Sequence, residues 1–99
     1  MRKIHKKRVS TNSKFFKEEL IFTKGWTKHH PTMDEPLDGM QANEGEVFGL
    51  SPGDITEAYY DYMRGKYVIK TYKTVWYELP KENLEMLREE RRVKLNVGR

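Results

Sequence analysis

The chain has 99 residues, a formal net charge of +4 and no cysteine. A chain of this length suits one domain with one core, and the absence of cysteine excludes disulfides, thiolate zinc sites and cysteine nucleophiles. No apolar stretch follows the basic first residues, so we expect a cytoplasmic protein with neither a signal peptide nor a membrane-spanning segment.

The charges are segregated along the chain. Residues 1–30 contain nine Lys or Arg and two Glu, residues 31–65 contain one Arg and eight acidic residues, and residues 66–99 contain nine basic and five acidic residues. If the fold brings the two basic ends together, they form a positive surface that attracts phosphates. If the acidic middle packs against the ends, the charges cancel. The sequence leaves both arrangements open.

The chain is predicted to begin with a flexible basic arm at residues 1–13, because six of its first eight residues are Arg, Lys or His and few can be buried. One α+β domain with a mostly antiparallel sheet is expected over residues 14–99.

Residues 14–24 fit two different elements. Asn12 or Ser13 is a suitable cap for a helix. The short apolar run at 20–23 instead suits a buried strand, and we favour a strand near 19–24.

The middle of the chain is predicted to contain a long loop near 29–45, because two prolines and two glycines lie there. A short apolar run predicts a strand near 46–50. Ser51 and Pro52 form a helix-start signal, and apolar residues then recur at helical spacing. We therefore predict a helix near 52–64.

The last third is predicted to form a hairpin with strands near 66–72 and 75–79, followed by a helix near 81–94. With Lys73-Thr74 as the turn, Val68 and Lys70 would share a face with Tyr77, and Ile69 would share the other face with Trp76. Lys-Thr is a poor two-residue turn, since neither residue readily adopts positive φ, so a longer loop is the alternative.

No catalytic motif is present in the sequence. It has no phosphate-binding glycine motif and no nucleophile motif, so we expect neither an enzyme nor a cofactor. His29 and His30 precede Asp34 and Glu35, but adjacent histidines rarely direct both rings at one metal ion. We therefore predict no metal site.

The leading hypothesis is a non-catalytic nucleic-acid-binding protein. Lysines and aromatic residues are interleaved in the hairpin, which suits a surface where bases stack and phosphates are held. The helix expected near 52–64 is acidic and would be repelled from a DNA groove, so RNA or single strands are favoured over sequence-specific duplex DNA. The candidate contacts lie in the arm, the hairpin and the last helix: Arg2, Lys3, Lys6, Lys7, Arg8, Lys66, Lys70, Tyr72, Lys73, Trp76, Arg88, Arg91, Arg92 and Lys94.

The alternative hypothesis is a small protein-interaction module, such as an inhibitor or adaptor of a larger protein machine, with a composition like that of bacterial and phage accessory proteins. Its contact surface would combine aromatic residues with the acidic loop, namely Tyr59, Tyr60, Tyr62, Trp76 and residues 34–46. A homodimer is compatible with both hypotheses.

Overall fold

The computed structural model describes residues 5–29, 40–42 and 44–97. It has one six-stranded antiparallel sheet with the strand order β1-β4-β5-β6-β2-β3. The strands are β1 (Lys6–Arg8), β2 (Thr27–His29), β3 (Met40–Gln41), β4 (Ile55–Asp61), β5 (Lys66–Thr71) and β6 (Trp76–Pro80). The helices are α1 (Lys14–Glu18), α2 (Glu44–Phe48) and α3 (Lys81–Val97), with short 3-10 turns η1 (Leu20–Phe22) and η2 (Pro52–Asp54). The predicted α+β class is confirmed.

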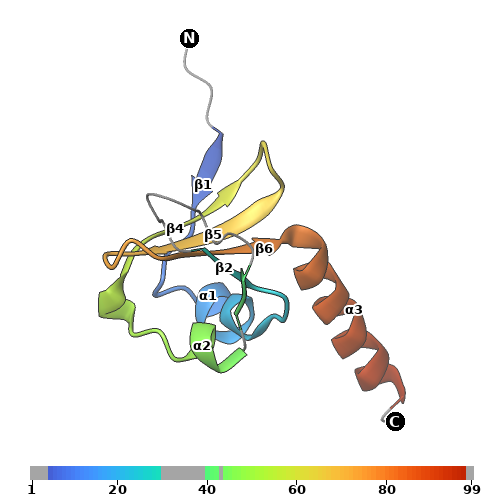
Figure 1. The fold of residues 1–99 in the computed structure, drawn as a ribbon. Coiled ribbons are helices and arrows are strands. Elements are labelled where there is room, and N and C mark those ends of the chain that lie inside the picture. Colours follow the sequence, from blue (N-terminus) through green and yellow to red (C-terminus); the bar gives the residue numbers. More distant parts are fainter. Residues whose placement is uncertain (1–4, 30–39, 43, 98–99) are drawn as a thin grey trace.

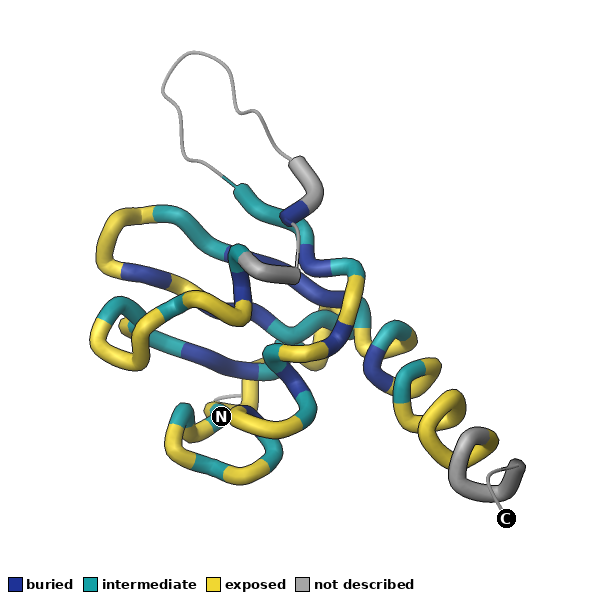
Figure 2. Tube along the Cα trace, turned by 90° about the horizontal axis from the view of Figure 1, so that it is seen from below, coloured by how far each residue is buried: buried dark blue, intermediate teal, exposed yellow. Residues whose placement is uncertain are grey.

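The helices are distributed unevenly around the sheet. Figure 1 shows α1 and α2 on one face, whereas α3 continues from the end of β6 and projects away from the sheet. Only the first turns of α3 pack on the body, where Leu84 is buried, and the helix is exposed farther along (Figure 2). The sheet therefore has one helix-covered face, and the core lies against it.

The core lies between the helix-covered face and the segments α1, η1 and α2. Its largest fully buried side chains include Ile69 and Leu79 of the sheet, Leu20 of η1, Val47 of α2 and Trp26 just before β2, and Phe16 of α1 is also buried. Burial of such side chains stabilises the fold by about 1.5–3 kcal/mol each.

The helix predicted near 52–64 is wrong. Ser51 does cap a turn, because its Oγ accepts a hydrogen bond from the Gly53 amide at 3.3 Å, but the turn ends after η2. The chain then forms β4, which pairs with β5 along almost its whole length. The amide of Gly65 donates to the Asp61 carbonyl at 2.8 Å, so this glycine closes a hairpin turn at φ +65° and does not end a helix.

The strands predicted near 19–24 and 46–50 are also wrong. The first segment contains η1 and directly follows α1, which Ser13 caps by accepting a hydrogen bond from the Phe16 amide at 3.1 Å. The second segment is mostly α2, which buries Val47. Both apolar runs are too short for periodicity to distinguish a strand from a buried helical turn.

The predicted hairpin and last helix are confirmed, but the hairpin register is shifted by one residue. The Thr71 amide donates to the Val75 carbonyl at 3.0 Å, so the loop has three residues and Thr74 adopts φ +65°. Such a loop reverses the faces expected for the second strand. Ile69 is therefore opposite Tyr77, and Lys70 is opposite Trp76.

Part of the predicted flexible arm belongs to the sheet, because Lys6–Arg8 form β1 and pair with β4. Residues 1–4 lie outside the described residues. Most of the loop predicted near 29–45 also lies outside them, and β3 and the start of α2 occupy described positions in its second half.

Because of two tyrosines on the helix-covered face, the protein is expected to lose stability at alkaline pH. Burial raises the pKa of both Tyr67 and Tyr77 above the usual value. The unfolded chain ionises these phenols from about pH 10, before the folded protein does, so the free energy of unfolding should fall as the pH rises above about 10. Urea unfolding at neutral and alkaline pH measures this. A Tyr67→Phe/Tyr77→Phe variant with an equally steep fall would contradict it.

Candidate nucleic-acid interface

The face of the sheet opposite α1 and α2, here called the open face, is covered by none of the described helices (Figure 1). Residues directly opposite each other in antiparallel strands share a face, and side chains alternate between faces along each strand. The strand register therefore places the following residues on the open face: Lys6, Arg8, His29, Glu57, Tyr59, Asp61, Lys66, Val68, Lys70, Trp76 and Glu78.

Glu78 is the buried centre of the open face, with a side chain only 5% exposed. Its Oε1 lies 3.1 Å from His29 Nε2 and 3.8 Å from Lys66 Nζ, and its Oε2 contacts the Arg64 guanidinium. A buried carboxylate is tolerated only when it is paired in this way. The side chains of Arg64 and Lys66 remain 47% and 38% exposed, so Glu78 orients two cations that still reach the surface.

Aromatic rings lie directly beside these charges. Trp76 stacks on the His29 ring, with centroids 5.1 Å apart and planes at 8°. The ring of Tyr59 lies under two ammonium groups, 4.6 Å from Lys6 Nζ and 5.6 Å from Lys70 Nζ. A surface pocket of about 220 Å³ opens between them and is lined by Tyr59, Arg64, Val68, Lys70, Trp76 and Glu78.

The open face carries an excess of positive charge. Its strands and the adjoining β4–β5 turn contribute five Lys or Arg side chains and three carboxylates. Lys6 is engaged by Glu57 at 2.6 Å, and this hydrogen bond raises the pKa of Lys6. Among the described residues, no acidic side chain pairs with Arg8 or Lys70, so these two cations remain available to an anionic ligand.

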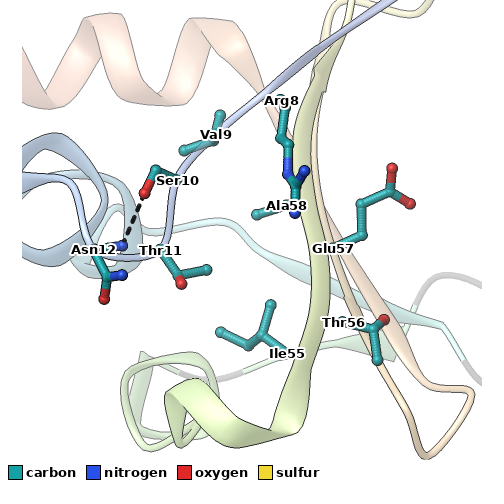
Figure 3. A pocket seen from close by; sticks show the side chains of 9 residues that line it. All are labelled: Arg8, Val9, Ser10, Thr11, Asn12, Ile55, Thr56, Glu57 and Ala58. Atoms are coloured by element: carbon teal, nitrogen blue, oxygen red, sulfur yellow. Dashed lines mark hydrogen bonds between the residues drawn. The ribbon is translucent and has the colours of Figure 1, made fainter.

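A polar pocket of about 420 Å³ borders the open face at the outer edge of β4 (Figure 3). The chain follows β4 as far as Val9, whose amide donates to the Ala58 carbonyl at 2.8 Å, and then separates from it. Figure 3 shows Ile55 and Ala58 pointing toward residues 9–12 across the gap, while Glu57 points away. Within the described residues, the first half of β4 therefore has no strand on its outer side.

Comparisons with known proteins identify no relative: no family model, no curated protein and no solved structure matches the chain. Among the described residues, no helix is both long and apolar enough to cross a membrane. In the same part of the chain, no three His, Cys, Asp or Glu side chains are grouped closely enough to hold a metal ion. The function is therefore argued from the open face alone.

The structure brings together five of the residues proposed from the sequence, namely Lys6, Arg8, Lys66, Lys70 and Trp76. The others lie elsewhere. Lys7 is on the helix-covered face, Tyr72 and Lys73 are in the β5–β6 turn, Arg88, Arg91, Arg92 and Lys94 are on α3, and Arg2 and Lys3 lie outside the described residues.

Arg88 links α3 to the body of the protein. Its Nε lies 3.0 Å from Glu19 Oε1, and its guanidinium lies over the Phe15 ring at 5.6 Å. Arg92 pairs with Glu89 on the same helix. These arginines therefore make contacts within the protein, and none of them lies on the open face.

The residues of the alternative hypothesis do not form one surface. Tyr59 and Trp76 are on the open face, whereas Tyr60 is on the helix-covered face with Tyr67 as its partner across the strands. Residues 34–39 and 43 lie outside the described residues. The aromatic residues of this hypothesis are thus divided between the two faces of the sheet.

Sequence reasoning did not include His29, Arg64 or Glu78 in the nucleic-acid interface, and it named Tyr59 only in the alternative hypothesis. Tyr59 was assigned to a helix, although the β-branched and aromatic residues around it, such as Ile55, Thr56 and Tyr60, favour a strand. His29 and Glu78 are far apart in the sequence, and only the pairing of β2 with β6 brings them together.

Proposed function

We propose that the protein is a non-catalytic binder of single-stranded nucleic acid, either RNA or single-stranded DNA, and that the open face is its contact surface. One observation carries the proposal: the partly exposed Trp76 lies with Arg64, Lys66 and Lys70 around the buried Tyr59, on a sheet face that no described helix covers. Aromatic side chains on which bases stack, with cations beside them for the phosphates, are how sheet proteins bind single strands.

Each group has a distinct role in the proposed complex. The exposed part of the Trp76 ring stacks on a base, while His29 supports the ring from its other side. Lys70 and the cations held by Glu78 bind phosphates. Stacking on a ring needs little sequence specificity, because every base has a π-face.

The shape of the open face favours single strands over duplex DNA. The major groove of B-DNA admits one helix or a two-stranded ribbon, whereas the open face belongs to a six-stranded sheet. Bases in a duplex are also stacked on each other and cannot reach Trp76. A single strand has neither restriction.

A fluorescence-anisotropy titration tests the proposal. The protein is added to labelled single-stranded RNA, single-stranded DNA and duplex DNA at low and at physiological salt. We expect micromolar or tighter binding of a single strand, with a slope of log affinity against log salt of roughly −3 for four or five neutralised phosphates. Preference for the duplex, or no binding at low salt, would contradict the proposal.

A further inference from the structure

A second pocket, here called the tyrosine pocket, lies on the opposite side of β1 and β4 from the open face. Its volume is about 480 Å³, which falls in the usual range for ligand sites of about 300–1,000 Å³. The pocket is lined by Lys7, Arg8, Val9, Ser10, Ser13, Phe15, Tyr60, Tyr62 and Tyr67.

Four aromatic rings form a continuous row in the tyrosine pocket. Phe15 and Tyr67 have centroids 5.9 Å apart, Tyr67 and Tyr60 are 4.8 Å apart, and Tyr60 and Tyr62 are 5.2 Å apart with perpendicular planes. Tyr62 ends the row at the surface with 53% of its area exposed. The row therefore gives a planar ligand an aromatic surface, and core side chains do not fill the pocket beside it.

The charges at the tyrosine pocket select an anionic ligand. Lys7 has its side chain on this face of β1 and has no acidic partner within the described part of the chain, whereas Arg8 borders the pocket from the β1 edge and directs its side chain to the open face. Glu19 and Glu85 lie near Tyr67, and Arg88 lies beside them, with its Nε 3.0 Å from Glu19 Oε1. A cationic ligand, such as a quaternary ammonium group, would be repelled by Lys7, although aromatic rings alone would suit it.

Strand β1 connects the two surfaces. It is an edge strand, and its side chains alternate, so Lys6 and Arg8 belong to the open face and Lys7 belongs to the helix-covered face. A phosphate backbone that crosses this edge therefore meets cations on both sides of β1.

We propose that the tyrosine pocket receives a base of the same nucleic-acid strand that occupies the open face, after its backbone has crossed β1. This inference rests on the proposed function and extends it to a second stacking site. The base stacks on the exposed ring of Tyr62, and Lys7 binds the adjoining phosphate. The strand then spans both faces of the sheet at its β1 edge.

The test compares single variants by anisotropy with a labelled RNA of about a dozen nucleotides, long enough to reach both sites. Tyr62→Ala should weaken binding by roughly five- to a hundredfold, the loss of one stacked base, whereas Tyr62→Phe keeps the ring and should bind normally. Phe48→Ala removes another exposed ring that lies in neither site and serves as the matched control. Thermal unfolding confirms that each variant is folded.

The outcomes separate this inference from the proposed function. Weak binding by Tyr62→Ala with normal binding by Tyr62→Phe and Phe48→Ala supports the tyrosine pocket. Normal binding by Tyr62→Ala, together with weak binding by Trp76→Ala, overturns the tyrosine pocket and leaves the open face intact. If the unaltered protein binds no single strand, the proposed function fails and this inference fails with it.

Discussion

Replacing Lys66 and Lys70 together by alanine is expected to weaken single-strand binding at low salt by at least about tenfold. Both ammonium groups belong to β5 on the open face, beside Trp76 and Tyr59. Each phosphate contact contributes roughly 0.7 to the salt slope of single-strand binding, so the slope should become shallower by roughly 1.4. Anisotropy titrations at several salt concentrations measure both quantities.

The matched control is Lys14→Ala/Lys17→Ala. These two lysines are exposed on α1, on the other side of the sheet, and their replacement changes the net charge of the protein by the same amount. We expect the control to bind within about twofold of the unaltered protein. Equal losses in the two double variants would mean that binding depends on net charge alone, and the open face would then have no special role.

Replacing Gly25 by alanine is expected to destabilise the fold by about 2–4 kcal/mol. Gly25 has φ +101°, and a Cβ there would lie 1.9 Å from Asn83 Nδ2. That amide donates to the Lys24 carbonyl at 2.9 Å and joins the start of α3 to the segment before β2. The substitution therefore strains the backbone and breaks this bond. Urea unfolding measures the free-energy change.

Gly53→Ala is the control for this prediction. Its added Cβ would meet nothing closer than Ser51 Oγ at 3.8 Å, so a change within about 0.5 kcal/mol is expected. A double variant, Gly25→Ala/Asn83→Ala, removes the side chain that the new Cβ meets and should lose less stability than the sum of its single variants. Strict additivity would show that Asn83 is not the source of the destabilisation.

The elements that the sequence predicts correctly are those with strong local signals. The hairpin strands are rich in β-branched and aromatic residues, and the α3 segment consists of good helix formers, so local propensity and the final fold agree. Before β4, by contrast, Ser51 and Pro52 do start a helical turn, η2, but the chain then pairs with β5 and does not continue as a helix. Whether this segment forms a helix or a strand therefore depends on pairing with residues that are distant in the sequence.

The candidate site was only partly predictable for a related reason. Lys66, Lys70 and Trp76 are visible as basic and aromatic residues in a hairpin, but the two-residue turn expected at Lys73-Thr74 placed Lys70 and Trp76 on opposite faces. The three-residue loop with Thr74 at φ +65° places them on one face. A shift of one residue in the strand register therefore determines whether a cation and an aromatic ring can contact the same ligand.

The network around Glu78 could not be predicted from the sequence at all. His29 comes from β2, Arg64 from the β4–β5 turn and Lys66 from β5, and their side chains converge only when the sheet has formed. In the sequence, Glu78 looks like one more acidic residue in a strand. Its burial and its partners depend on the order of the strands, for which the sequence contains no local signal.

Intrinsic tryptophan fluorescence tests the central claim most directly, because the two tryptophans differ in position. Trp76 lies on the open face, whereas Trp26 is 1% exposed in the core. Unlabelled single-stranded RNA should quench the emission of the unaltered protein as bases stack on Trp76, and Trp76→Phe, which keeps only Trp26, should show no quenching. Equal quenching in Trp76→Phe, or unchanged emission while anisotropy reports a complex, would contradict base stacking on the open face.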